Sequence, residues 1–171
     1  GRFLFYEMID WKTYHANLAV RDLTTGQSRP ILETKSNENG ARLSPDGRWL
    51  AYFSDESGSE EVFIRSFPAS SDRSQVSAGG GAQPRWRGDG KELFYVSPDG
   101  KIMSVEIRTE PKLQAQTPRA LFSTRILPLI EARNNYDVTA DGQRFIVNSR
   151  RAEDAFLPIT VVVNWRRGVE K

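Results

Sequence analysis

Short runs of consecutive apolar residues recur along the chain, and each follows an Asp-Gly pair. Leu50–Phe53, Leu93–Val96 and Phe145–Val147 are the three full examples. Within these runs the residues do not alternate between apolar and polar. An uninterrupted apolar run of this length is typical of a β-strand that is buried on both faces. The pattern therefore predicts strands that lie between two neighbouring layers of structure.

The Asp-Gly pairs mark an internal repeat. The shared glycine falls at 1, 47, 90 and 142, so the spacings are 46, 43 and 52 residues. Glycine adopts a positive φ at little cost, and Asp-Gly therefore favours a tight turn between strands. The repeated turn residues are Asp46, Gly47, Asp89, Gly90, Asp141 and Gly142. The sequence thus contains four copies, of which the first starts within its turn.

The first copy opens with the strand at Gly1–Tyr6. Three further strands can be traced in each of the first three copies and one in the last, separated by turns rich in glycine, proline and serine. The expected segments are Leu18–Asp22, Val62–Phe67, Ile102–Ile107 and Ile159–Asn164; then Ser28–Leu32, Arg73–Val76 and Arg119–Phe122; then Ala41–Ser44, Pro84–Arg87 and Tyr136–Thr139. No amphipathic helix of three turns is present. Four short antiparallel strands in each repeat of about 40 to 50 residues predict the blades of an all-β propeller.

The strand count predicts an incomplete ring. Fourteen strands over residues 1–171 form a single propeller segment, with four strands in each of three repeats and two in the last. An open ring leaves sheet edges exposed to pairing. We expect either a fragment of a larger protein, a homodimer in which two copies close an eight-bladed ring, or a segment excised to study how blades assemble.

Composition excludes several kinds of chemistry. The chain has no cysteine and a single histidine, so thiol catalysis, cysteine-ligated zinc and a multi-histidine metal site are not available. No Gly-x-Ser-x-Gly motif is present, and we predict no catalytic residue, no metal and no cofactor. The net charge is +2, but the basic residues are scattered, which argues against a nucleic-acid partner. No apolar run is long enough to span a membrane.

Two segments are candidate binding surfaces. Trp11, Tyr14 and His15 are expected in the loop after the first strand, where they either pack on a blade edge or recognise a partner. The loop from Ser123 to Asn135 accounts for the longest spacing. Its apolar side chains either cover one end of the propeller or bind a partner, and its last residues are expected on a propeller face. The residues concerned are Ile126, Leu127, Leu129, Arg133, Asn134 and Asn135.

Two other segments have a simpler interpretation. The acidic run Asp55–Glu61 could supply oxygen ligands to calcium, but its spacing does not match an EF-hand, and we predict a solvated hairpin turn. The run Gly79–Gly81 lacks the lysine and the following helix of a phosphate-binding loop. We therefore expect a flexible turn there.

The run Ser44–Phe53 resembles the TolB-like propeller repeat, a relative of the WD repeat. Gly79–Tyr95, Tyr136–Phe145 and Pro158–Trp165 resemble one subgroup, the carboxy-terminal propellers of bacterial receptor-type serine/threonine kinases. This resemblance implies an extracytoplasmic sensor or interaction module that binds a protein or a small ligand and is not an enzyme. The alternative is an accessory propeller that gates a prolyl-oligopeptidase-like serine hydrolase. Gly88 and Ala140 depart from the repeat, which has proline there.

Overall fold

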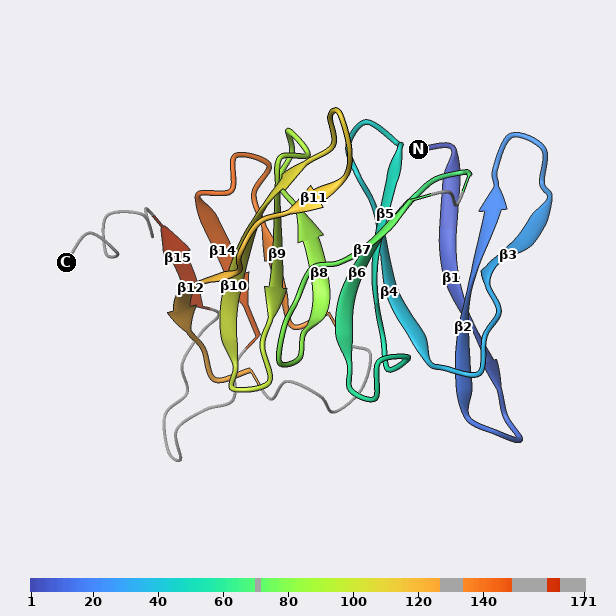
Figure 1. Ribbon diagram of the computed structural model, residues 1–171, viewed down its shortest axis with the longest axis horizontal. Coiled ribbons are helices and arrows are strands. Elements are labelled where there is room, and N and C mark those ends of the chain that lie inside the picture. Colours follow the sequence, from blue (N-terminus) through green and yellow to red (C-terminus); the bar gives the residue numbers. More distant parts are fainter. Residues whose placement is uncertain (70–71, 127–133, 149–159, 164–171) are drawn as a thin grey trace.

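The computed structural model describes residues 1–69, 72–126, 134–148 and 160–163, and within these residues it is all-β (Figure 1). The strands are β1 (Phe3–Asp10), β2 (His15–Asp22), β3 (Ser28–Leu32), β4 (Glu38–Leu43), β5 (Trp49–Ser54), β6 (Glu61–Ser66), β7 (Arg73–Gln75), β8 (Ala82–Trp86), β9 (Glu92–Val96), β10 (Lys101–Arg108), β11 (Gln114–Ala115), β12 (Arg119–Ser123), β13 (Tyr136–Val138), β14 (Arg144–Val147) and β15 (Thr160–Val163). Each of the fourteen expected segments contains a strand, and β11 is an addition. No helix in the described part of the chain could cross a membrane.

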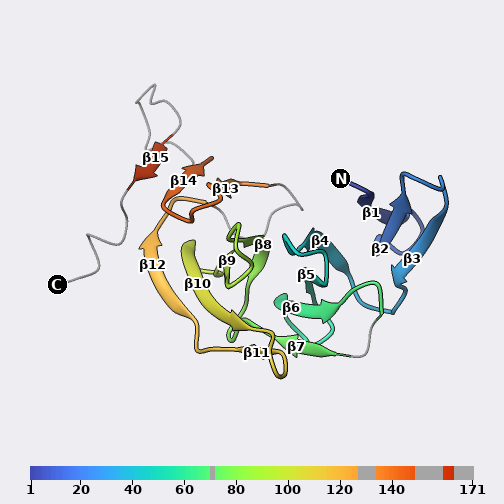
Figure 2. The same cartoon turned by 90° about the horizontal axis from the view of Figure 1, so that it is seen from above.

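The strands form four antiparallel sheets that follow one another along the chain. Their orders are β1-β2-β3, β4-β5-β6-β7, β8-β9-β10 with β11 and β12 both on β10, and β13-β14-β15. Seen from above, the sheets fan out as an arc, with β4, β8 and β13 on its inner side and β3, β7 and β11 on its outer side (Figure 2). The predicted β-propeller blades are confirmed. The second, third and fourth sheets each begin with the strand that precedes an Asp-Gly turn, β4, β8 and β13, so these sheets and the sequence repeats are offset by one strand.

The cores lie between the sheets, which explains the uninterrupted apolar runs. In β5, Leu50 and Tyr52 pack toward the first sheet, whereas Ala51 and Phe53 pack toward the third. In β9, likewise, Leu93 and Tyr95 pack toward the second sheet, whereas Phe94 and Val96 pack toward the fourth. Because neighbouring residues of a strand point to opposite faces, both sets must be apolar in a sheet that is covered on both sides.

The prediction of burial on both faces was wrong for the first and last sheets. In β14, Phe145 and Val147 are buried, but Ile146 between them is 46% exposed. In β1, Leu4 is 50% exposed. No other described sheet lies on the outer side of these two, so only one face of each is covered. The large apolar side chains that are exposed therefore lie in the first and last sheets, at the two ends of the arc.

The Asp-Gly turns have the expected geometry. Gly47, Gly90 and Gly142 have φ of 75°, 71° and 70°, the left-handed region that glycine favours. A further copy, Ser97–Gly100, has the same Ser-Pro-Asp-Gly sequence as the turn that joins the first and second strands of the second sheet, but it joins the second and third strands of the third sheet, β9 and β10. The tetrapeptide thus specifies a turn, and not a position in the blade.

The two departures from the repeat motif contact each other. The N–H of Gly88 donates to the carbonyl oxygen of Ala140 at 2.8 Å, which links the turn before β9 to the turn before β14. A Cβ atom at Gly88 would lie 2.8 Å from that oxygen and 2.9 Å from the Ala140 Cβ. Proline has no N–H and would also overlap with Ala140. Glycine at this position is therefore required by the packing of one blade against the next.

Glu38 is a buried carboxyl group at the start of β4. It is 1% exposed, the Thr34 hydroxyl donates to its Oε1, and its Oε2 has no hydrogen-bond partner within the described residues. Burial raises the pKa of Glu38 above its usual 4.5; Thr34 and Arg65 oppose the shift, while Glu56 and Asp55 add to it. Folding thus favours the neutral form of Glu38 more than the unfolded state does.

We expect Glu38→Gln to remove a pH dependence of stability. Because the folded pKa is raised, Glu38 stabilises the fold fully below the unfolded pKa, and this contribution is lost as pH rises through the folded pKa. Urea unfolding between about pH 4 and pH 8 should therefore show the wild type losing stability relative to the variant as pH rises. A constant difference between the two proteins over this range would contradict the assignment.

Candidate functional site

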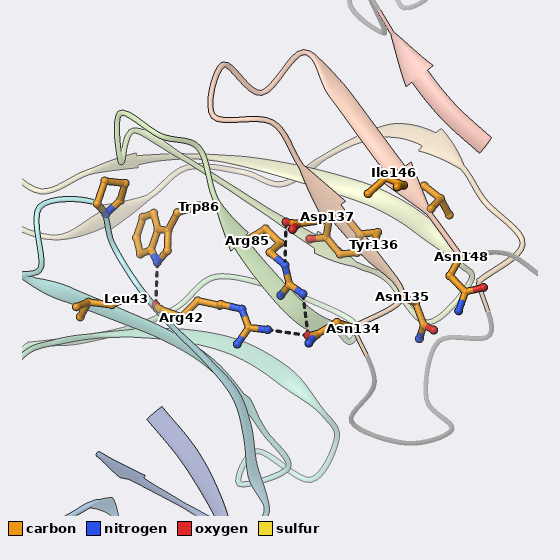
Figure 3. Close-up of a pocket in the computed structure, with 12 residues that line it drawn as sticks. Arg42, Leu43, Arg85, Trp86, Asn134, Asn135, Tyr136, Asp137, Ile146 and Asn148 are labelled. Atoms are coloured by element: carbon orange, nitrogen blue, oxygen red, sulfur yellow. Dashed lines mark hydrogen bonds and ion pairs between the residues drawn. The ribbon is translucent and has the colours of Figure 1, made fainter. Parts of the chain in front are cut away.

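A cavity lies on the inner side of the arc, where the second, third and fourth blades meet. It has a volume of about 730 Å³, which is within the range of ligand pockets. The strands β4, β8 and β13, together with β14 and the turn residues beside them, provide its lining (Figure 3). The lining residues are Arg42, Leu43, Pro45, Arg85, Trp86, Asn134, Asn135, Tyr136, Asp137, Ile146, Val147 and Asn148.

Three charged residues occupy the same place in three blades. Arg42, Arg85 and Asp137 each stand five positions before the glycine of the following Asp-Gly turn, on the innermost strand of the sheet. Equivalent positions of neighbouring blades lie side by side around the centre of a propeller. The repeat therefore brings the three side chains to one cavity although they are distant in sequence.

A backbone irregularity precedes each of the two arginines. Gly40 and Gln83, two residues earlier in each strand, have positive φ values of 64° and 58°. The pairing register shifts between Asn39 and Arg42 in β4, and at the equivalent place in β8. Such bulges redirect the side chains that follow them. A left-handed glutamine is strained, by about 1 to 2 kcal/mol, and strain of this kind is concentrated at functional sites.

Asn134 joins the two arginines. Arg42 Nη2 and Arg85 Nη2 each donate to Asn134 Oδ1 at 2.7 Å (Figure 3). The other terminal nitrogen of each guanidinium donates to the carbonyl of the preceding residue in its own strand. Two positive charges are thus held within reach of one neutral oxygen atom.

One carboxylate approaches this pair. Asp137 Oδ1 lies 3.4 Å from Arg85 Nε, and the Asp137 side chain is 70% exposed, so water screens the pairing. Arg42 forms no ion pair with a described residue. Burial, followed by the neighbouring charge of Arg85, lowers the pKa of Arg42, although Asp137 and Glu7 oppose the shift. The cavity therefore holds an excess of positive charge.

Two aromatic residues complete the wall. Trp86 Nε1 donates to the Arg42 carbonyl at 3.0 Å and fixes β8 against β4. Arg85 lies over the Tyr136 ring, with its guanidinium carbon 5.5 Å from the ring centre. Tyr136 is 3% exposed, and its hydroxyl has no hydrogen-bond partner within the described residues. Burial raises the pKa of Tyr136, so this hydroxyl stays protonated and is available as a donor.

The long loop contributes to this cavity in part. Asn134 and Asn135 lie in its lining, and the N–H of Asn135 donates to the Gln83 side chain at 2.8 Å. Ile126 is 4% exposed and belongs to the core between the third and fourth sheets, so it is not a surface contact as one hypothesis had it. The remaining candidates, Leu127, Leu129 and Arg133, lie outside the described residues.

The aromatic segment near the amino terminus is placed away from the cavity, at the β1–β2 turn. Trp11 and Tyr14 are each 75% exposed, which excludes the interpretation that they pack on a blade edge. The prediction that His15 lies in the loop was wrong, because β1 extends to Asp10 and His15 pairs with it at the start of β2. These two aromatic side chains remain a candidate recognition surface.

The acidic hairpin and the glycine run contact each other. Glu61, at the start of β6, accepts hydrogen bonds from the Ser77 hydroxyl, from the Gly79 N–H at 3.1 Å and from the Gly80 N–H at 2.9 Å. The glycines thus bind a carboxylate of the chain itself, and the expected flexible turn is in fact held in place. Asp55 accepts two hydrogen bonds from Asn37. These carboxylates have structural partners.

No protein-family model matches the sequence. It is 27% identical over 108 residues to the uncharacterized peptidase YuxL of Bacillus subtilis, which covers 62% of this chain and 16% of the relative. The structure is similar to TolB from Acinetobacter baumannii, with a TM-score of 0.73, 18% identity, and 98% of this chain and 39% of that chain covered.

Two peptidase propellers are also similar. The β-propeller domain of the Trilobed protease from Pyrococcus furiosus has a TM-score of 0.57 and 18% identity, with 94% of this chain and 50% of that chain covered. A puromycin-hydrolyzing peptidase from Mycobacterium tuberculosis has a TM-score of 0.58 and 18% identity, with 85% of this chain and 25% of that chain covered. At these identities the likeness establishes the propeller fold. The chain spans half or less of each of these proteins.

Proposed function

We propose that this chain is a non-catalytic interaction or sensor module of a larger bacterial protein, and that it binds its partner in the cavity on the inner side of the arc. The observation that carries the proposal is the paired placement of Arg42 and Arg85 at equivalent repeat positions. Propellers host unrelated activities, so the argument rests on this site and not on the fold. The resemblance to TolB-like repeats favours an extracytoplasmic location, and a receptor-type kinase is the parent we favour.

The second candidate is a propeller that gates the active site of a peptidase. The peptidase name of the sequence relative and the propellers of two peptidase structures favour it. The two candidates differ in what adjoins the chain in its parent. A kinase domain with H-R-D and D-F-G elements would favour the sensor, and a hydrolase domain with a Gly-x-Ser-x-Gly motif would favour the gate.

Photo-crosslinking in the source cells tests the proposed binding site. In the full-length protein, Asn148 in the cavity lining is replaced by benzoylphenylalanine, with Lys112, an exposed residue between β10 and β11, as the matched control position. We expect a defined adduct from position 148 and none from position 112. Equal adducts at both positions, no adduct at position 148, or turnover of a substrate by this chain alone would contradict the proposal.

A further inference from the structure

The strongest unassigned feature of the cavity is its net positive charge, since two arginines face one exposed carboxylate, that of Asp137. The two guanidiniums donate to three neutral oxygen atoms, those of Asn134, Ala41 and Pro84. Hydrogen bonds from a guanidinium to a carboxylate are shorter and about twice as strong as those to neutral acceptors. A ligand carboxylate would therefore be a better acceptor than Asn134 Oδ1 at the point where the two side chains converge.

The geometry favours a ligand that is anionic at one point only. Arg42 and Arg85 meet at a single oxygen atom, and each already uses one terminal nitrogen on its own strand. The nearby carboxylate of Asp137 would repel a large or highly charged anion.

The rest of the cavity matches a peptide better than a free ion. Its volume of about 730 Å³ greatly exceeds that of one carboxylate. Leu43, Pro45, Trp86 and Ile146 supply the apolar part of its lining. The side-chain amide of Asn148 can bond to a peptide backbone. An aliphatic side chain beside the acidic one would cover part of this apolar lining.

We propose that this cavity binds an acidic peptide segment, in which a glutamate or aspartate carboxylate replaces or joins Asn134 as the acceptor for Arg42 and Arg85, and an adjacent aliphatic side chain packs on Leu43 and Trp86. This inference rests on the proposed function, since it names the ligand of the same site. Arg85, which is 8% exposed, is the more fully desolvated of the two cations, and its contact with the peptide is the stronger one.

Calorimetric titration of the full-length protein tests the ligand. The probe is a blocked peptide with one glutamate between two leucines, and its counterpart has glutamine instead. We expect the glutamate peptide to bind at least tenfold more tightly than the glutamine peptide, with an affinity that falls as salt is added. Equal affinities for the two peptides would overturn the proposal, as would binding of inorganic phosphate without binding of either peptide.

Charge-neutralising variants test the two contacts. Arg85→Gln and Arg42→Gln should each weaken the glutamate peptide about tenfold or more and leave the glutamine peptide almost unchanged. Arg144→Gln is the matched control, because Arg144 is an exposed residue of β14 outside the lining, and it should bind like the wild type. Equal weakening by all three variants would show a general charge effect and overturn the assignment. Thermal unfolding of each variant verifies that it is folded.

The two proposals can fail separately. A protein that forms the adduct from position 148 but does not distinguish the glutamate peptide from the glutamine peptide has the proposed function without the proposed ligand. A protein that distinguishes the peptides through Arg85 but forms no adduct in cells has the ligand chemistry without the cellular role.

Discussion

Replacing Phe94 by alanine is expected to lower the free energy of unfolding by about 3 to 5 kcal/mol, the cost of removing a fully buried aromatic side chain. Phe94 is 0% exposed, and its ring meets that of Phe145 edge to face at 5.1 Å. The two rings belong to β9 and β14, so their contact holds the third sheet against the fourth. Urea unfolding of the variant and the wild type measures the loss.

Phe94→Leu is the matched control for this effect. Leucine keeps most of the apolar volume, and we expect a loss of about 1 to 1.5 kcal/mol. A loss below about 1 kcal/mol for the alanine variant would show that the two sheets move together and fill the space left by the Phe94 ring, or that this ring contact contributes little to stability. In either case the packing of the third sheet against the fourth would stabilise the protein less than described.

Gly88→Pro, which restores the repeat motif, is expected to destabilise the protein by about 2 to 3 kcal/mol. The substitution removes the hydrogen bond to the Ala140 carbonyl and places ring atoms where the Ala140 backbone lies. A consensus argument from the sequence alone would predict the opposite sign, because a proline in a compatible turn restricts the unfolded chain. Chemical unfolding of the variant decides between the two.

Pro45→Gly makes the reciprocal change in the turn of the second sheet. This turn has the proline of the repeat motif. Because proline has no N–H, the substitution removes no hydrogen bond of the type that Gly88 donates to Ala140. Glycine gives the unfolded chain more freedom, so we expect a loss of about 0.4 to 1 kcal/mol. The description of the Gly88 contact would be contradicted if Gly88→Pro proved neutral or stabilising while Pro45→Gly lost stability.

Much of the fold could be predicted from the sequence because its signals are local. The Asp-Gly turns set the strand boundaries, and the runs after them indicate burial on both faces in β5 and β9. The strand β11, Gln114–Ala115, could not be predicted, since two residues have no periodicity. The exposure of Ile146 also could not be predicted. The apolar run that contains it does not indicate whether another sheet covers the outer face of the strand.

The candidate site was predicted only in part. Asn134 and Asn135 were expected on a propeller face, and they lie in the cavity lining. Arg42 and Arg85 were missed, although aligning the repeats on their Asp-Gly turns places both at one position. That alignment would have shown the pair. Their meeting at Asn134 could not have been deduced, because Asn134 comes from the next blade and spacing along the sequence does not show which side chains meet between blades.

The offset between sheets and sequence repeats has a consequence for how such chains change length in evolution. The strand before each Asp-Gly turn pairs with the strand after it, as β4 does with β5 and β8 with β9. Removal of one whole repeat between two such turns would join β4 to β9 through an equivalent hairpin. Every sheet would still be complete, and only the contact between neighbouring blades would be new. Duplication and unequal exchange at these turns can therefore alter the number of blades without creating an unpaired strand.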